Sequence, residues 1–555
     1  MKKLFSLVLC GILTLALLPL NACKKEEALV LNVYNWEDYI ACDEEVYDMV
    51  AEFEKWYPTT HGGKAVKVNY STFGTNENMY NELKLTQKKN GDYSYDLVCP
   101  SEYMIQKMIL EGMCIKFDID ATGYTKVPNY TKNVAPYIEE LFASNGWNEY
   151  ALCYNWGTMG FTYNPDPNPS TEGLSESITE DVNSWQVVSN PKYANKITIK
   201  DSVRDSYVLA LGYLHKDELM ALQKNHEQNP AVYTDEVYKK ELKRLLNDFD
   251  DQTIEKARVL LTDVRQNLYG FEVDSGKQDM ATGKLWINFA WSGDAVYAMD
   301  IAEEVGTELE YAVPKEGSNI FFDGWVMPKG ANTELAQTFL NFMYEEEKAI
   351  ENLDYICYSS PMVGEQLFEY VCDNYGLTTL IPCEEETDYQ DSDGNYYEEV
   401  YILNDPDFQT NFVNNGDSLT YRLAYLDDDG NISHEEIEIF AHSVKHFFED
   451  KIEGDGIIYT DSLKRQLVAM YPTQETMDRC VVMEHLETET LKKLNNMWDS
   501  VKVGYMKYST MLIIVISVIV VAVVVFVLIL LAKKGKTIRL RKKNLGKLVK
   551  SERIK

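Results

Sequence analysis

Catalytic motifs and histidine are scarce in this chain of 555 residues. It has only seven histidines, and their scatter does not indicate a metal centre. The sequence contains no G-x-S-x-G elbow, Walker loop, Rossmann glycine fingerprint or H-E-x-x-H motif. His434 and Glu435 begin a similar pattern, but the second histidine is missing. We therefore expect neither an enzyme nor a resident metal or cofactor.

Cysteine is also used sparingly, at ten positions, and no two cysteines form a C-x-x-C pair. The sequence therefore does not support a zinc ribbon or a thioredoxin-like centre. Cys99 and Cys153 lie in apolar runs that are typical of buried thiols. An exported protein can form disulfides, but the sequence does not show which cysteines would pair.

Positive charge is scarce except near the two ends of the chain. The whole sequence has 53 Lys and Arg against 88 Asp and Glu, a net charge of −35. The part between residues 23 and 532 keeps 40 basic residues against 87 acidic ones, a net charge of −47. Such a surface repels nucleic acid phosphates and attracts cations. We therefore expect no nucleic-acid partner, and we favour a cationic ligand over an anionic one.

A long apolar segment lies near the C-terminus. Residues 511–532 contain no charge, and Ser517 is their only polar side chain. A helix of this length is about 33 Å long, enough to cross a bilayer core. The tail 533–555 carries eleven Lys or Arg and one acid, Glu552. The positive-inside rule places this tail in the cytoplasm and the main body across the cytoplasmic membrane.

The N-terminus predicts export in the same orientation. Two lysines precede an apolar run at 4–20, and Leu20-Asn21-Ala22-Cys23 follows. This ending resembles a bacterial lipoprotein signal, which implies cleavage after residue 22 and lipidation of Cys23. An ordinary signal peptide is the alternative. One acyl chain binds a membrane only marginally, so the C-terminal helix would be the stronger anchor.

Strand and helix patterns alternate through the exported body. A hydrophobic fraction of 45% indicates a globular chain, and nearly 490 residues are too many for one core. Apolar runs predict strands at 29–33, 65–72, 95–99, 196–200, 285–290 and 325–327. Helical spacing predicts helices at 43–57, 76–88, 102–111, 205–214 and 333–350. The alternation favours an α/β fold with a parallel sheet and at least two lobes.

The acidic segment 384–461 differs from the rest. It contains two turn-like stretches, at 391–395 and 427–431, which predict β-hairpins. The second stretch partly resembles a calcium loop, with Gly430 and Glu436 at suitable spacing. Tyr425 occupies the first ligand position, where an acid is needed, so we favour the hairpin.

An exported two-lobed α/β protein without catalytic motifs indicates a solute-binding protein with its ligand between the lobes. Eight segments, in order, then resemble the spermidine/putrescine-binding proteins of bacterial polyamine ABC transporters. They are LNVYNWEDY (31–39), YDLVCPSEY (95–103), YNWGT (154–158), KDSVRD (200–205), FAWSGDA (289–295), VPKEG (313–317), FDGW (322–325) and YSSP (358–361). The resemblance implies a two-lobed periplasmic-binding-protein fold, a hinged clamp, with an added transmembrane helix.

The resemblance also implies a set of ligand-binding residues. Aromatic walls, polar contacts and acids are expected from Trp36, Asp38, Tyr39, Ser101, Tyr103, Asp205, Trp291, Phe321, Asp323 and Tyr358. These residue types suit a polyamine, because carboxylates bind ammonium groups and aromatic faces bind both methylenes and cations. We expect Asp323 to be the main ammonium partner.

Two positions depart from the family pattern. One of the two acids expected near Asp205 is Ser202, and a tryptophan expected two residues before Asp323 is Phe321. A polar partner near the family's C-terminus cannot be placed, because the acidic segment interrupts the alignment. The choice among putrescine, spermidine and a related amine therefore stays open.

The resemblance implies the following organisation. A signal peptide occupies 1–22, lobe 1 occupies 29–152 and 322–368, and lobe 2 occupies 153–321 and 369–505 with the insertion 384–461. The expected function is polyamine delivery to an ABC permease and its ATPase. The alternatives are the same fold binding another amine or a metal, an enzyme acting on a surface polymer, and a sensor. The short tail argues against a sensor.

Overall fold

The computed structural model describes residues 28–376, apart from 44, 45, 169 and 172, and residues 465–505. It also describes residues 516, 517 and 519 and the pieces 389–390, 396–397, 413–414, 419–426, 432–448, 451–454 and 456–460. The predicted signal peptide, Cys23, the basic tail and nearly all of the predicted transmembrane segment lie outside these residues. Within the described part, no helix has the length and apolar character needed to cross a membrane.

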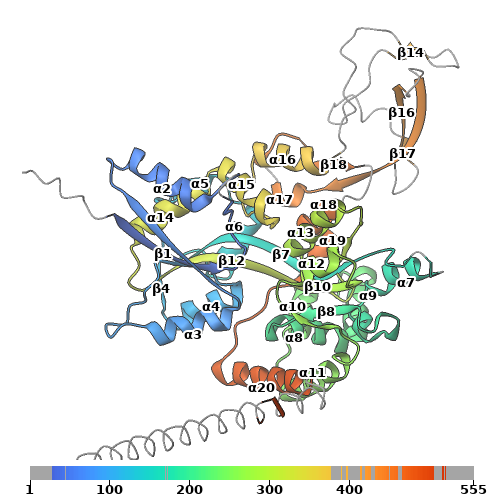
Figure 1. Cartoon of the computed structure of the whole chain (residues 1–555), viewed down its shortest axis with the longest axis horizontal. Coiled ribbons are helices and arrows are strands. Elements are labelled where there is room, and N and C mark those ends of the chain that lie inside the picture. Colours follow the sequence, from blue (N-terminus) through green and yellow to red (C-terminus); the bar gives the residue numbers. More distant parts are fainter. Residues whose placement is uncertain are drawn as a thin grey trace, which may run out of the picture.

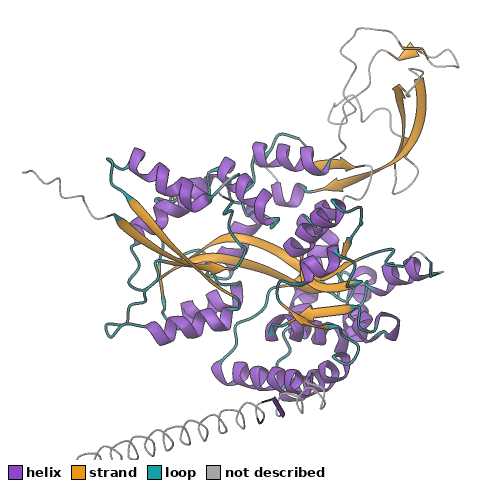
Figure 2. Ribbon diagram, viewed as in Figure 1, coloured by secondary structure: helices purple, strands orange, loops and turns teal. Residues whose placement is uncertain are grey.

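One mixed sheet of eleven strands runs through the molecule and carries a lobe at each end (Figure 2). Its two long strands, β7 (Ala151–Tyr163) and β12 (Ser318–Pro328), pass from one lobe into the other (Figure 1). Every residue of both strands is buried. The structure thus has the predicted two-lobed α/β architecture, in which β7 and β12 form the connection.

The first lobe is built on β1 (Leu29–Trp36), β2 (Val66–Phe73) and β3 (Leu97–Val98), which are parallel. Strand β4 (Cys114–Ile115) pairs with β12 at the edge of this lobe. The flanking helices are α2 (Met49–Thr60), α3 (Asn76–Thr86), α4 (Glu102–Leu110), α14 (Thr333–Met343) and α15 (Glu346–Ile356). Apolar side chains facing the sheet fill the core between these layers.

The second lobe is built on β8 (Ile197–Lys200), β9 (Gly270–Glu272) and β10 (Ile287–Trp291), also parallel to one another. Strand β11 (Glu310–Ala312) pairs with β7. The main helices are α8 (Val203–Leu214), α9 (Lys216–Gln228), α10 (Asp235–Leu246), α11 (Asp251–Val264), α12 (Gly276–Ala281), α13 (Ser292–Glu303) and α20 (Thr488–Tyr505). Helix α20 packs on α11 and α8.

Two sequence predictions about these elements are wrong in part. The sheet is mixed, because β12 is antiparallel to β3 and β7, and β7 is antiparallel to β10. The predicted helix 333–350 is two helices, because Glu345 has an extended backbone and begins α15. The hydroxyl of Tyr344 donates to the Cys153 carbonyl oxygen at 2.6 Å and anchors this break. Helical spacing in 333–350 also predicts a core face of five residues: Leu335, Phe339, Leu340 and Met343 are buried, and Ile350 is half-buried.

The strands that connect the lobes contain a β-bulge, and a third segment of the chain also crosses from one lobe to the other. The pairing of β12 with β7 shifts between Asp323 and Gly324, so β7 bulges there. Strand β19 (Cys480–Val481) pairs with β12, and Met483 donates its backbone N–H to a Glu102 oxygen at 3.2 Å. The chain therefore passes between the lobes at three places.

The acidic insertion contains antiparallel strands at both predicted hairpins. Strand β13 (Tyr389–Gln390) pairs with β14 (Tyr396–Tyr397), and β16 (Leu419–Leu426) pairs with β17 (Ile432–Ser443). The β16–β17 hairpin projects from the body (Figure 1). The predicted hairpins are confirmed, although their turn residues lie outside the described part.

The described cysteines carry free thiols at seven positions. Cys99 and Cys153 are fully buried, as predicted, while Cys42 is exposed. Cys10, Cys23 and Cys383 lie outside the described residues.

Candidate functional site: a cleft between the lobes

A cleft lies between the two lobes, next to the strands that connect them. It encloses about 900 Å³ of space between side chains, including solvent at its mouth. Its lining comes from both lobes and includes all ten residues expected to bind ligand. The ten residues thus lie together, although 322 positions separate Trp36 from Tyr358 in the sequence.

Asp323 on β12 is a buried carboxylate in the lining of the cleft. Its side chain is 5% exposed and accepts hydrogen bonds from the Ser101 hydroxyl at 2.6 Å and the Tyr39 hydroxyl at 2.8 Å. No Lys or Arg of the described residues forms an ion pair with it. Burial raises the pKa of Asp323 to about 6, although the two hydroxyl groups oppose this rise. A cation entering the cleft would find this carboxylate without a counter-ion.

Aromatic rings form the walls around this carboxylate. Tyr39 and Tyr358 meet edge to face, with ring centroids 4.7 Å apart. Phe321, two residues before Asp323 on the same strand, lies 6.4 Å from Tyr358 in the same arrangement. Trp36 packs against Phe73 with centroids 4.7 Å apart. These rings offer flat apolar surfaces to a hydrocarbon chain.

The first lobe holds Ser101 and Tyr103 in place through a residue that sequence reasoning missed. The Asn76 side chain, at the start of α3, donates to the Ser101 hydroxyl at 2.9 Å and to the Tyr103 hydroxyl at 3.0 Å. Tyr103 in turn donates to Glu77 at 3.3 Å. Asn76 is buried and lines the cleft, but an isolated asparagine at a helix start resembles many ordinary helix caps.

Asp205 approaches from the second lobe, in the first turn of α8. Ser202 is the N-cap of this helix, with its hydroxyl 3.5 Å from the Asp205 backbone nitrogen. Ser202 stands where the family pattern predicts a second acid. At this position the cleft wall therefore contains a helix-capping serine in place of a carboxylate. Burial raises the pKa of Asp205 to about 6. Arg204 crosses to the first lobe and lies over the Tyr103 ring, 4.3 Å from its centroid.

Asp38 differs from the other expected residues because it is exposed at the rim of the cleft. Its φ of +48° lies in the left-handed region, which aspartate tolerates better than most residues.

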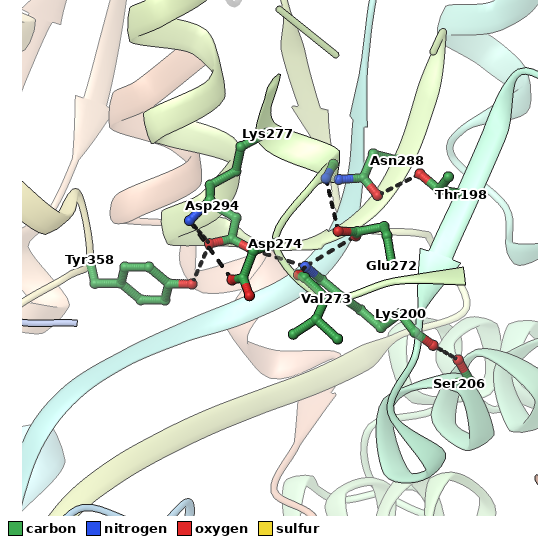
Figure 3. Close-up of polar contacts among 11 residues, drawn as sticks. Thr198, Lys200, Ser206, Glu272, Val273, Asp274, Lys277, Asn288, Asp294 and Tyr358 are labelled. Atoms are coloured by element: carbon green, nitrogen blue, oxygen red, sulfur yellow. Dashed lines mark hydrogen bonds and ion pairs between the residues drawn. The ribbon is translucent and has the colours of Figure 1, made fainter. Parts of the chain in front are cut away.

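The second lobe also brings a charged cluster to the cleft (Figure 3). Asp294 lies in the first turn of α13 and accepts hydrogen bonds from the Tyr358 hydroxyl at 2.8 Å and the Lys200 ammonium at 2.9 Å. Lys200 also forms an ion pair with Glu272 at 3.2 Å. Lys277 and Asp274 complete the cluster. Sequence reasoning missed these side chains as site residues, because three separate segments supply them.

Two further buried polar groups line the cleft. Glu102 accepts backbone N–H bonds from Phe322 and Met483, and burial raises its pKa to about 8. Asn319 lies on the same face of β12 as Phe321 and Asp323, and its buried Oδ1 has no hydrogen-bond partner among the described residues. The described residues contain no group of three or more His, Cys, Asp or Glu that could hold a metal ion.

Two lobes joined by crossing strands, with a polar and aromatic cleft between them, define a clamp-type solute-binding protein. Residues 48–364 match the family model described as "Bacterial extracellular solute-binding protein", and the chain belongs to this family. The family places the main body outside the cytoplasm.

Curated relatives extend this assignment. The putrescine-binding periplasmic protein SpuD of Pseudomonas aeruginosa is 31% identical over 381 residues, which cover 66% of this chain and 89% of SpuD. The putrescine-binding periplasmic protein PotF of Escherichia coli is 27% identical, with coverage of 62% and 82%. A solved structure from Listeria monocytogenes, described as a spermidine/putrescine ABC transporter, has the same fold, with a TM-score of 0.52, 22% identity and coverage of 86% and 99%. The homologues are solute-binding proteins of ABC transporters and not enzymes, as expected for this chain.

Proposed function

We propose that this protein is the extracytoplasmic polyamine-binding component of an ABC importer. It would capture putrescine or spermidine between its lobes and deliver it to a permease driven by an ATPase. The observation that carries the proposal is Asp323, a buried carboxylate whose hydrogen-bond donors among the described residues are two hydroxyl groups, in a cleft walled by aromatic rings. The names of the curated relatives support the choice of ligand.

The chemistry of the cleft suits one ammonium group near Asp323. A hydrogen bond to a charged group contributes about 1.5–3 kcal/mol, and a cation–π contact about 0.5–2 kcal/mol. Tyr39, Tyr358 and Phe321 would contact the methylenes next to this group, and Asp205 would attract a second ammonium from the opposite lobe. A few such contacts could give micromolar binding, about −8 kcal/mol.

We also propose that the protein is held at the membrane. Residues 511–532 would form the transmembrane helix, with the tail 533–555 in the cytoplasm, and Cys23 would carry lipid after removal of residues 1–22. The end of α20 at Tyr505 lies six residues before this segment, so the clamp would stay close to the bilayer. The tether would raise the local concentration of loaded clamp beside its permease.

Calorimetry on the full-length chain in a mild detergent tests the ligand assignment. We expect micromolar binding of putrescine or spermidine, and Asp323→Asn should weaken it at least tenfold, because the ammonium would lose its charged partner. Asp166→Asn, at an exposed loop position, is the matched control and should bind like the wild type. No binding of either polyamine at millimolar concentration would rule out the proposed ligand.

A further inference from the structure

A lysine of the protein fills the second-lobe end of the cleft. Lys200, the last residue of β8, is 1% exposed although it lines the cleft wall. Its ammonium donates to the Val273 carbonyl oxygen at 2.6 Å and to Asp294 at 2.9 Å, and it pairs with Glu272 at 3.2 Å. Two of its three N–H groups therefore form hydrogen bonds, and Glu272 Oε1 balances the charge through an ion pair without accepting a hydrogen bond.

The same ammonium lies over an aromatic ring of the cleft. Its nitrogen is 3.9 Å from the centroid of the Trp291 ring, which is cation–π distance. Two carboxylates, one carbonyl oxygen and a tryptophan face are the contacts that a polyamine ammonium group would need. Here the protein supplies that ammonium itself (Figure 3).

Most carboxylate oxygens around Lys200 already accept hydrogen bonds; the exception among the described residues is Glu272 Oε1, which is held by its ion pair with the Lys200 ammonium at 3.2 Å. Asp294 Oδ2 accepts the Lys200 ammonium, while its Oδ1 accepts the Tyr358 hydroxyl and lies 3.8 Å from the Lys277 ammonium. Glu272 also accepts the backbone N–H of Gly276 at 2.9 Å. A ligand ammonium would have to displace these buried contacts before it could bind here, and leaving a buried charge without its partner is costly.

Two other acids of the cleft have the reverse character. Asp323 and Asp205 are both buried, and neither forms an ion pair with a Lys or Arg in the part of the chain that the structure describes. Asp323 and Asp205 thus form no ion pair, whereas in the second-lobe cluster Lys200 and Lys277 already pair with Glu272, Asp294 and Asp274.

We propose that Lys200 is a specificity-determining residue, a built-in ammonium that makes the cleft select a diamine over a triamine. This inference rests on the proposed function and goes further by naming the preferred polyamine class and the residue that sets it. A third ammonium group would meet Lys200 where it needs a carboxylate, and like charges in a buried site repel.

Removal of the internal ammonium tests the inference. Lys200→Met alone would leave Glu272 and Asp294 uncompensated and could unfold the lobe, so the decisive variant is the charge-balanced pair Lys200→Met with Glu272→Gln. The wild type should bind putrescine at least as tightly as spermidine. In the double variant, Asp294 becomes available, so the ratio of spermidine to putrescine affinity should rise about tenfold or more.

A second Lys–Glu pair, in which the glutamate is buried and the lysine is half-buried, provides the control. Lys216 lies 3.5 Å from Glu316, which is 1% exposed, and neither residue lines the cleft. Lys216→Met with Glu316→Gln removes a similar pair and should leave the affinity ratio unchanged. The titrations use full-length protein in detergent, and circular dichroism confirms that each variant is folded.

The outcomes separate the inference from the proposed function. If the folded Lys200/Glu272 variant keeps the wild-type ratio, Lys200 does not set the preference, while polyamine binding itself stands. A wild type that prefers spermidine tenfold would also overturn the inference alone. If the wild type binds neither polyamine, both the inference and the proposed function fail.

Discussion

At the residue scale, the cleft contains buried carboxyl groups that form no ion pair with a described Lys or Arg. Burial raises the pKa values of Asp323 and Asp205 to about 6 and that of Glu102 to about 8. A carboxylate that leaves water without a cation costs free energy, and this cost is relieved when a cation binds. These buried carboxylates therefore lower the unfolding free energy of the ligand-free protein.

Asp323→Asn should stabilise the empty protein while it weakens binding. A carboxyl group whose folded pKa is raised takes up protons on folding, so stability falls as pH rises from about 4 to about 6 and stays low above that. Asparagine keeps a neutral side chain at every pH. The unfolding free energy without ligand should therefore rise by about 1–2 kcal/mol at pH 7.5, with a much smaller gain at pH 4.5.

Urea unfolding at the two pH values measures this effect, with Asp166→Asn as the control. An Asp323→Asn protein that is less stable than the wild type at pH 7.5 would contradict the prediction. It would indicate that the hydrogen bonds from Tyr39 and Ser101 outweigh the burial of the charge.

Sequence alone predicted one class of site residue and missed another. Asp323, Tyr39 and Trp291 lie in segments whose order matched a known family, and all of them line the cleft. Lys200 also lies in such a segment, but its role depends on Glu272, which belongs to a different strand. A partner brought in by sheet topology leaves no local pattern in the sequence, so the internal ammonium could only be found in three dimensions.

At the scale of elements, periodicity predicted most helices and strands, but it did not predict their connections. The parallel strands β1–β3 and β8–β10 follow the expected alternation with helices. Strands β7 and β12 are buried along their whole length, and an apolar run carries no information on its direction in a sheet. The antiparallel crossings that join the lobes were therefore not predicted.

Helix α13 requires glycine at its second position, Gly293, because the Tyr358 ring in the cleft wall packs directly against it. A Cβ atom at Gly293 would collide with the Tyr358 ring, whose hydroxyl binds Asp294 one residue further on. Gly293→Ala should push Tyr358 away from Tyr39 and weaken polyamine binding about tenfold, since overpacking displaces side chains. Titration calorimetry measures this loss of affinity.

Gly212→Ala in α8 is the matched control, because its Cβ would collide with the buried Trp185, away from the cleft. This substitution should lower the unfolding temperature and leave the dissociation constant near the wild-type value. Equal dissociation constants for the wild type and Gly293→Ala would show that the position of Tyr358 does not matter for binding.

At the scale of the whole molecule, side chains from both lobes meet across the cleft as in a closed clamp. Arg204 of the second lobe stacks on Tyr103 of the first and donates to the Glu484 carbonyl oxygen at 2.7 Å. Tyr358 reaches Asp294 from the opposite side. These contacts exist only when the lobes are close together, so they favour the closed form over an open one.

Arg204→Lys should shift this balance towards the open form. Lysine keeps the positive charge beside the acids of the cleft but loses the planar guanidinium that covers the Tyr103 ring. Loss of about 1 kcal/mol from the closed form alone would speed polyamine release about fivefold, because the ligand leaves when the lobes part. Stopped-flow fluorescence measures the release rate, and hydrogen exchange in α4 and α8 reports opening of the two lobes.

Arg258→Lys, which changes an exposed ion pair with Glu255 on α11, is the control and should change neither the release rate nor the exchange. Unchanged release and exchange in Arg204→Lys would mean that the Arg204–Tyr103 stack does not hold the clamp closed, and closure would then depend on the ligand and the Tyr358–Asp294 contact.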